Sequence, residues 1–408
     1  MVDKKGLLIN SEIGKLKKVL MHRPGKEIEN LTPELMERLL FDDIPFLEMA
    51  RKEHDDFANL LRSKGVEVLY LKDLVVESLK DLNVKKQFII EFIEGTKTDS
   101  KNMKKALEEY FLSFDDTGEM IDEMIQGVRS DTVTISKRDT LSDYTNDDEQ
   151  FVADPMPNLY FIRDPFSTIA NGVAVSHMKS MVRRRESIFT NYILNYHPDF
   201  RDEEISKWYD PKDQFILEGG DIAVLSEEVV VVGISKRTEP EAIDVLAKRL
   251  LKDKNSINTI LVFELPKGRQ FLHLDTVFTM IDKEVFLIDP DIEGALKIYS
   301  IQKDSKDNMI FTEERLTLER ILSKYLKLKY VELIRCGGYR GIDAAREQWS
   351  NATNALAIGP GKVIANARNH VTNDLLKRKG ISVDIISSSE LSRGHGGPRC
   401  MVLPLVRE

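Results

Sequence analysis

The sequence predicts an α/β fold made of repeated modules, each with two strands, a helix and a further strand. Three observations lead to this prediction. The same order of strand and helix patterns recurs after residue 150, the two chain ends carry complementary parts of one more module, and residues 75–149 interrupt the series with helical periodicity alone. Repeats of this kind stack or close on themselves. We therefore predict a five-bladed, pseudosymmetric α/β propeller of ββαβ modules with a helical-bundle insertion.

The clearest module begins at Phe215. An apolar strand over 215–225 turns back as a second strand over 229–234. Thr238-Glu-Pro-Glu then opens a helix, and residues 259–263 form the closing strand. One face of this helix is apolar, with Ile243, Leu246, Ala247, Leu250 and Leu251.

Two later modules and one earlier module repeat this order. The expected segments are strands over 272–281, 284–288 and 330–334 with a helix over 318–326; strands over 355–358, 362–365 and 382–386 with a helix from about 372; and, upstream, strands over 159–162 and 172–176 with a helix over 188–196.

The chain ends supply the two parts of the fifth module. Residues 401–406 predict a strand with nothing after it, whereas 17–22 predict a strand followed by a helix over 46–61 and a strand over 66–71. Joining the last strand to the first completes the module, and the terminal strands then close the ring. An open α/β sheet without closure is the alternative.

The interruption defines the predicted domain organisation. Residues 1–74 and 150–408 form the catalytic propeller domain, and residues 75–149 form an inserted helical subdomain. Apolar residues at helical spacing support the insertion: Leu79, Leu82, Ile89, Phe92, Ile93, Met103, Leu107, Tyr110, Phe111, Met120, Ile121, Met124 and Ile125.

The composition favours an ordinary cytoplasmic protein. With 59 Lys and Arg against 68 Asp and Glu, the net charge of −9 argues against nucleic acid as the main partner. Apolar runs such as 229–234 are too short to span a membrane, and residues 1–10 lack the apolar core of a signal peptide. The two cysteines, Cys336 and Cys400, exclude a disulfide framework and a Cys-rich metal site.

Four chemically active residues recur at one position of the modules. Asp164, Glu218, His273 and Cys400 each lie at or beside a first strand, and the first three follow at intervals of 54 and 55 residues. Equivalent positions in a ring of modules converge on its axis. We therefore expect one pocket lined by all four.

Each motif also has a purely structural explanation. Asp164 before a proline is a common turn opener. The acid–Gly–Gly–acid run from Glu218 to Asp221 could be a tight bend. His273 and Asp275, two apart on a strand, would share one face and could form a metal site or a structural hydrogen bond. These motifs reinforce one another only because the repeat brings them to one pocket.

The cysteines differ in their surroundings. A lone cysteine is most often an inert apolar side chain, which is our interpretation of Cys336. Cys400 instead follows a glycine-rich loop that enters a strand. Nearby carboxylates raise a thiol pKa, which suits a cysteine whose substrate is itself a cation. A bound guanidinium offers N–H groups to carboxylates and favours the thiolate. Guanidine chemistry is thus favoured over a zinc hydrolase, since no tight Cys/His cluster occurs, and we expect no metal or cofactor.

Motifs along the whole chain resemble those of the arginine deiminases, within the guanidino-modifying superfamily. They are Ser11–Gly25, Phe161–Pro165, Leu217–Asp221, His273–Thr276 and Gly396–Met401, together with the helical insertion. The resemblance implies a five-bladed α/β propeller. It also implies arginine catabolism by hydrolysis of L-arginine to L-citrulline and ammonia, through a thiouronium intermediate on the cysteine.

The resemblance also implies a role for each residue of the reacting centre. Cys400 is the nucleophile, and His273 is the general acid and base. Asp164 and Asp275 hold the guanidinium nitrogens. Glu218 supports His273.

For the amino-acid end of the substrate, the family pattern falls on Asn158, Arg183 and Arg237, with Asp221 as a further acid of the substrate site. Some members have an arginine in the glycine-rich loop that pairs with the carboxylates when substrate is absent. This chain has His395 in that loop, so this role is not transferred.

The expected partner is the small molecule L-arginine, and we expect a homo-oligomer, a dimer or a tetramer. Alternatives are an agmatine deiminase or an amidinotransferase of the same superfamily, or a non-catalytic arginine-binding protein. Two arginines directed at a carboxylate argue against agmatine, which has none. The order of motifs argues against an amidinotransferase, and the presence of both Cys400 and His273 argues against a non-catalytic protein.

Overall fold

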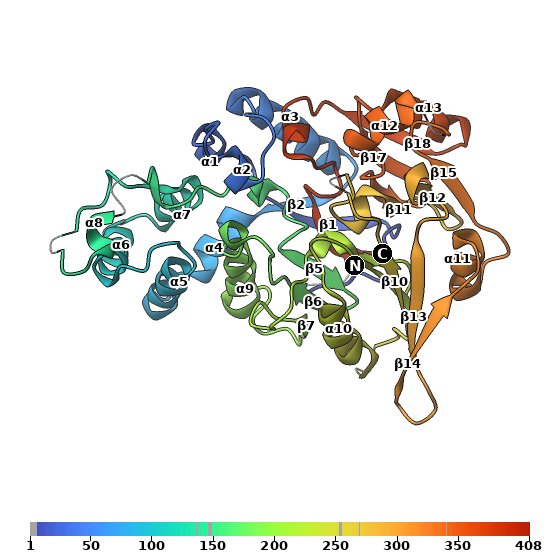
Figure 1. The fold of residues 1–408 in the computed structure, drawn as a ribbon, viewed down its shortest axis with the longest axis horizontal. Helices are drawn as coiled ribbons and strands as arrows, with labels where there is room; N and C mark the ends of the chain where they lie inside the picture. Colours follow the sequence, from blue (N-terminus) through green and yellow to red (C-terminus); the bar gives the residue numbers. More distant parts are fainter. Residues whose placement is uncertain (1–5, 136–137, 146–148, 253–254, 269, 340) are drawn as a thin grey trace.

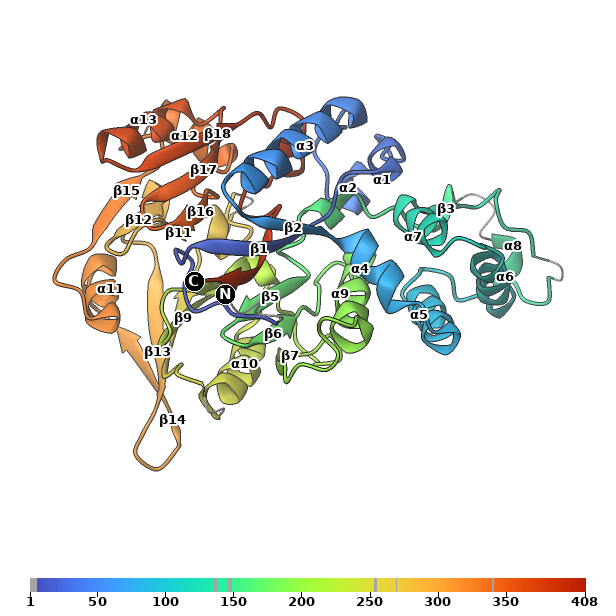
Figure 2. The same cartoon turned by 180° about the vertical axis from the view of Figure 1, so that it is seen from behind.

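A computed structural model describes residues 6–408, except 136–137, 146–148, 253–254, 269 and 340. The described chain has a mixed α/β fold in which five small sheets are flanked by helices, and a helical extension projects at one side (Figure 1). Both termini lie near the middle of the molecule, in this view and from behind (Figure 2). None of the described helices combines the length and apolarity that crossing a membrane requires.

The five sheets share one arrangement of three strands. A central strand pairs antiparallel with one neighbour and parallel with the other. The strands, with the central one in the middle, are β5 (Phe166–Ile169), β6 (Gly172–Val175) and β7 (Ser206–Tyr209); β8 (Ile222–Val224), β9 (Val229–Ile234) and β10 (Thr259–Glu264); β11 (Phe278–Met280), β12 (Val285–Ile288) and β15 (Glu332–Arg335); β16 (Leu356–Gly359), β17 (Lys362–Asn366) and β18 (Ser382–Ile386); β19 (Leu403–Arg407), β1 (Leu16–Met21) and β2 (Glu67–Tyr70).

A helix connects the two parallel strands of each sheet, because parallel neighbours need a crossover connection. These helices are α9 (Glu186–Tyr196), α10 (Pro240–Lys252), α11 (Leu318–Leu326), α13 (His370–Arg378) and α3 (Leu47–Ser63). The predicted face of α10 is confirmed, since Ile243, Leu246 and Leu250 are all buried. The helix predicted over 46–61 is confirmed as α3, although Phe46 and Met49 near its start are exposed.

The last strand pairs with the first, as the sequence predicts. β19 runs antiparallel to β1, with Leu403 opposite Leu20 and Pro404 opposite Val19. The backbone of Leu8 also bonds to Leu405. The sheet of the two termini thus has the same strand order as the four others.

The helical segment predicted around residues 75–149 contains α4 (Leu71–Ser78), α5 (Leu82–Glu94), α6 (Lys101–Leu112), α7 (Thr117–Gln126) and α8 (Ser142–Thr145). A short pair, β3 (Val128–Arg129) with β4 (Phe151–Ala153), was not predicted. Phe92 and Phe111 meet edge to face, and their cluster continues to Phe189 of α9 and to Leu20 and Leu403 of the terminal sheet. These helices therefore share one core with the neighbouring sheets.

A hairpin and three short helices are absent from the sequence prediction. A long hairpin of β13 (Lys297–Lys303) and β14 (Met309–Glu314) extends the sheet of β10 and projects from the molecule (Figure 1). The helices α1 (Lys26–Glu29) and α2 (Met36–Leu39) follow β1, and α12 (Ile342–Trp349) precedes β16.

The predicted first strands are wrong in their extent. The strands expected over 159–162, 215–225 and 272–281 are replaced by short 3₁₀ turns, and β5, β8 and β11 begin only afterwards. The turns are η1 (Pro157–Tyr160), η3 (Gly219–Asp221) and η4 (Leu274–Thr276). Their polar side chains bond to neighbouring loops instead of continuing a ladder, as with Asp221 Oδ1, which accepts from Leu274 N at 2.8 Å. The candidate residues thus lie in turns just before the first strands.

Candidate active site

The candidate residues surround a cavity of about 550 Å³. Asp164, His273 and Cys400 line it, although they come from three different sheets. Glu218 does not line it, contrary to the prediction, because its fully buried side chain lies behind His273. Other lining residues are Asn158, Phe161, Arg183, Arg237, Leu40, Phe41, Trp349 and His395.

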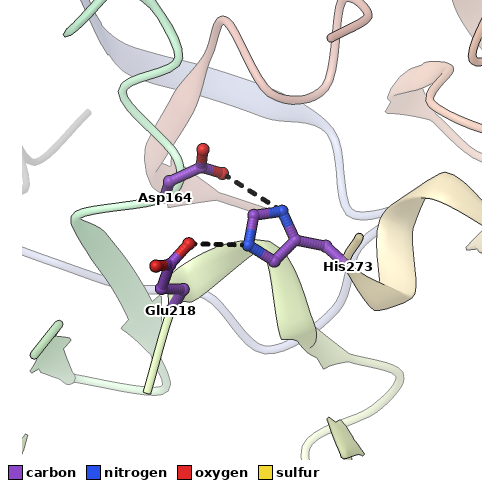
Figure 3. A group of neighbouring side chains, drawn as sticks. All are labelled: Asp164, Glu218 and His273. Atoms are coloured by element: carbon purple, nitrogen blue, oxygen red, sulfur yellow. Dashed lines mark hydrogen bonds and ion pairs between the residues drawn. The ribbon is translucent and has the colours of Figure 1, made fainter. Parts of the chain in front are cut away.

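His273 lies between two carboxylates. Its Nε2 is 2.9 Å from Glu218 Oε2, and its Nδ1 is 3.8 Å from Asp164 Oδ1 (Figure 3). Burial alone lowers a histidine pKa, but Asp164, Glu218 and Asp221 outweigh it and raise the pKa of His273 to about 9. Burial raises the pKa of Glu218, yet Arg237 and His273 together hold it well below its usual range. His273 is therefore an imidazolium at neutral pH.

The same three residues could supply metal ligands, since one atom of each lies within 4.8 Å of the others. However, Asp164 and Glu218 face different ring nitrogens of His273 (Figure 3). A metal ion would bind only one ring nitrogen of His273. The carboxylate that faces the other nitrogen could then share the ion only after the imidazole ring had turned. The carboxylates are also engaged by Arg183 and Arg237. This arrangement favours a protonated ring over a metal ligand.

Cys400 is buried in a second polar group of the cavity wall. Its Sγ donates to Asp275 Oδ2 at 3.3 Å and accepts from Asn354 Nδ2 at 3.1 Å. Burial, then Asp275 and Asp164, raise the pKa of the Cys400 thiol well above its usual value, against the opposing charge of Arg399. The resting group is a neutral thiol. His273 and Asp275 therefore do not share one face of a strand: the imidazole contacts Glu218, whereas the carboxylate contacts Cys400 and Arg399.

Asp275 is held by a buried arginine that the sequence did not single out. Arg399 Nη1 donates to Asp275 Oδ2 at 2.8 Å, and its Nη2 lies 3.2 Å from Glu12 Oε1. All three side chains are buried. Arg399 thus holds the Asp275 carboxylate in place beside the thiol. Its position next to Cys400 was the only sequence signal for this role.

The predicted carboxylate-binding arginines occupy the cavity wall. Arg183 is buried, and its Nη1 donates to Asp164 Oδ2 at 2.8 Å while Nε and Nη2 bond to Glu186 at 2.9 and 2.8 Å. Arg237 is partly exposed, with Nη1 3.4 Å from both oxygens of Glu218. Glu186 was missed, although it stands three residues after Arg183 at helical spacing.

Two predicted residues have different surroundings. Asn158 lines the cavity, and its Nδ2 donates to the carbonyl of Leu39 at 2.6 Å, so its side-chain oxygen remains available. Asp221 is fully buried outside the cavity wall, where Ser235 donates to Oδ2 at 2.6 Å. Burial raises the pKa of Asp221 to about 6. This residue shapes the turn under His273 and has no direct access to the cavity.

Comparisons with known proteins agree on one family. The family described as arginine deiminase matches residues 37–407. The chain is 51% identical to the arginine deiminase of Clostridium perfringens, over 100% of both chains. It is 47% identical to that of Borrelia duttonii, over 99% of this chain and 98% of that protein.

Solved structures show a shared mixed α/β fold. A DDAH from Pseudomonas aeruginosa in complex with citrulline aligns with a TM-score of 0.50 and 14% identity, over 95% of this chain and 99% of that chain. An amidinotransferase from Microseira wollei, from saxitoxin biosynthesis, aligns with a TM-score of 0.50 and 16% identity, over 98% of this chain and 97% of that chain.

Proposed function

The chain belongs to the arginine deiminase family and is a hydrolase of the guanidino C–N bond of arginine, and from this premise we propose that Cys400 and His273 carry the chemistry while Asp164 and Asp275 hold the guanidinium. The products are L-citrulline and ammonia. Cys400, His273 and Asp164 line one cavity from three separate turns, and Asp275 lies beside Cys400 with its Oδ2 3.3 Å from Sγ. This arrangement matches a planar substrate group held from several sides.

One observation carries this proposal. Asp164 Oδ1 and Asp275 Oδ1 are buried, and neither accepts a hydrogen bond from any described residue. A buried carboxylate oxygen without a donor is costly, by about 1–3 kcal/mol or more. The N–H groups of a guanidinium would satisfy both oxygens, in addition to neutralising their charge. The same cation would lower the thiol pKa and so favour attack by Cys400.

The reaction then follows from the two groups. When the guanidinium binds, the Cys400 thiol releases its proton to solvent, and the thiolate Sγ attacks the guanidinium carbon. The His273 imidazolium gives a proton to the departing nitrogen, which leaves as ammonia. A covalent S-alkylthiouronium remains on Cys400. The neutral His273 next takes a proton from water, which adds to the same carbon. The C–S bond then breaks to release citrulline, and the proton of the added hydroxyl group returns to the sulfur. Glu218 favours the protonated ring in the first step.

Substrate selection is assigned to three further residues that line the cavity. Arg183 and Arg237 would contact the α-carboxylate, and Asn158 would hold the adjoining polar groups. Glu186 and Asp164 orient the Arg183 side chain. Agmatine, which lacks the carboxylate, would lose these contacts. An amidinotransferase would need a second amine acceptor in the cavity, whereas the assigned residues account for one amino-acid substrate.

Three broader assignments belong to the same proposal. The five sheets of equal strand order close into a five-bladed propeller, with the pairing of β19 and β1 as its clasp. Residues 1–74 and 150–408 form this domain, and residues 75–149 are an inserted helical subdomain. The protein assembles as a homodimer or homotetramer in the cytoplasm.

The direct test is turnover by purified protein. L-Arginine should give L-citrulline and ammonia in equal amounts, and agmatine should react far more slowly. A preference for agmatine, or transfer of the amidino group to an added amine instead of release of ammonia, would contradict the assignment.

A further inference from the structure

Asn354 is fully buried and contacts both the sulfur of Cys400 and the loop that carries it. Its Nδ2 donates to Cys400 Sγ at 3.1 Å and to the carbonyl of Asp275 at 3.3 Å. Its Oδ1 accepts from the backbone N–H groups of Cys400 at 3.0 Å and Gly397 at 3.2 Å. All hydrogen-bonding groups of this side chain are therefore used in the site.

These contacts fix the orientation of the amide. Two backbone N–H groups face Oδ1, so the oxygen cannot exchange places with the nitrogen without two donor–donor contacts. The amide nitrogen must then face Sγ. The loop is fitted closely around it, because a Cβ at position 397 would lie 2.8 Å from Asn354 Cβ, and only glycine avoids this contact.

The module pattern places Asn354 with the other site residues. It stands just before β16, the first strand of its sheet, as Asp164 stands before β5, His273 before β11 and Cys400 before β19. Each first strand is thus preceded by a polar residue of the site. Asn354 occupies this position in the fifth module, for which the sequence predicted no site residue.

We propose that Asn354 is a further catalytic residue, whose amide N–H stabilises the Cys400 thiolate when it forms and the sulfur as it leaves in the second step. This inference rests on the proposed role of Cys400 as nucleophile. The surroundings of the sulfur explain the need for such a donor. Burial, Asp275 and Asp164 all disfavour a negative charge on Sγ, and among the described charged groups only Arg399 favours it. A fixed dipole directed at a charge that develops during reaction costs no reorganisation.

The test compares two variants. Asn354→Asp keeps an acceptor for the two backbone N–H groups but replaces the donor to the sulfur by a negative charge, whereas Asn354→Ala removes the donor without adding a charge. Alkylation of Cys400 by iodoacetamide, without substrate, is followed by mass spectrometry of its peptide between pH 7 and pH 10. The apparent thiol pKa should rise by about one or more, and alkylation near pH 8 should slow at least about tenfold, because a hydrogen bond to a charged group is lost. kcat/KM for L-arginine should fall at least as much.

Asn373→Asp is the matched control. Asn373 is buried to a similar degree and donates to the carbonyl of Asn366 at 2.9 Å, and it forms no hydrogen bond with a described residue of the site. It should change thermal stability but not the alkylation profile. If Asn354→Asp does not fold, Asn354→Ala provides the same alkylation test.

The inference is overturned if a folded Asn354 variant alkylates at the wild-type rate across this pH range, or if kcat/KM is unchanged. Neither result would change the proposed role of Cys400 as the nucleophile. That role fails only if Cys400→Ala retains activity.

Discussion

The Nε2 atom of His273 lies 2.9 Å from Oε2 of Glu218, and both side chains are buried. Glu218 thus favours the protonated form of His273, which supplies the proton for the departing ammonia. Glu218→Gln should remove this charge and lower the pKa of His273 from about 9 toward its usual value. Activity of the variant should decline at a lower pH than that of the wild type.

The pH dependence of kcat measures this effect. The alkaline limb should move down by about one unit or more, and activity at acidic pH should be affected least. Glu77→Gln is a matched control, because Glu77 lies 3.3 Å from His197, outside the site. An alkaline limb that stays in place in Glu218→Gln would show that the carboxylate does not set the protonation of His273.

The free energy of unfolding should also depend on the protonation of His273. The folded pKa of His273, about 9, lies above the unfolded value of 6.5. The protonated ring therefore contributes stability that is fully present below about pH 6.5 and is lost as the pH rises through about 9. Urea denaturation at several pH values should show this loss for the wild type and a smaller one for Glu218→Gln. Equal losses would place the stabilising charge elsewhere.

Arg237 tests substrate selection with fewer lost ion pairs than Arg183, because among the described residues it is paired with Glu218 alone, at 3.4 Å. Arg183 is buried in ion pairs with Glu186 and Asp164, so its replacement leaves unpaired charges. Arg237→Gln should reduce kcat/KM for L-arginine by roughly tenfold to over a hundredfold, since a lost charged contact costs ~1.5–3 kcal/mol, and should affect agmatine far less.

The control for this prediction is the replacement of Arg249, a residue of α10, by Gln. This change breaks the ion pair of Arg249 with Asp213, away from the cavity. It should leave the ratio of the two substrates unchanged. An Arg237→Gln enzyme with the full wild-type preference for L-arginine would remove Arg237 from the carboxylate site.

Metal removal tests the interpretation of the Asp164, Glu218 and His273 group. Because the two carboxylates face different ring nitrogens of His273, we expect a protonated imidazole between them and not a metal ion. Dialysis against a strong chelator should leave the rate of citrulline formation unchanged. Activity that disappears and returns only with a divalent ion would falsify this interpretation.

The sequence predicts the central strands and crossover helices because their residues repeat apolar patterns that few other structures satisfy. β9 has five consecutive buried residues from Val229, and α10 has a clear apolar face. The turns before the first strands could not be predicted, since they depend on contacts between modules, such as Asp221 with the backbone of Leu274. The hairpin of β13 and β14 was missed because Ile310 and Phe311 are exposed, so burial does not shape its pattern.

Within the site, the sequence identified the reacting groups but not the residues that hold them. Arg399, Glu12 and Asn354 act through partners distant in sequence, with Glu12 separated from Arg399 by 387 residues. No pattern of neighbouring residues predicts a contact between residues so far apart in the sequence. Asn354 is the exception, because its place before β16 repeats the position of the other site residues.

The central claim is that Cys400 forms the covalent bond to the substrate. The chain has two cysteines, and Cys336 is equally buried but lies outside the cavity. L-Arginine turnover should vanish in Cys400→Ala and persist in Cys336→Ala, and acid-quenched wild-type enzyme should carry the thiouronium mass on the peptide of Cys400. Citrulline formation by Cys400→Ala at the wild-type rate, or an adduct on the Cys336 peptide instead, would contradict the account.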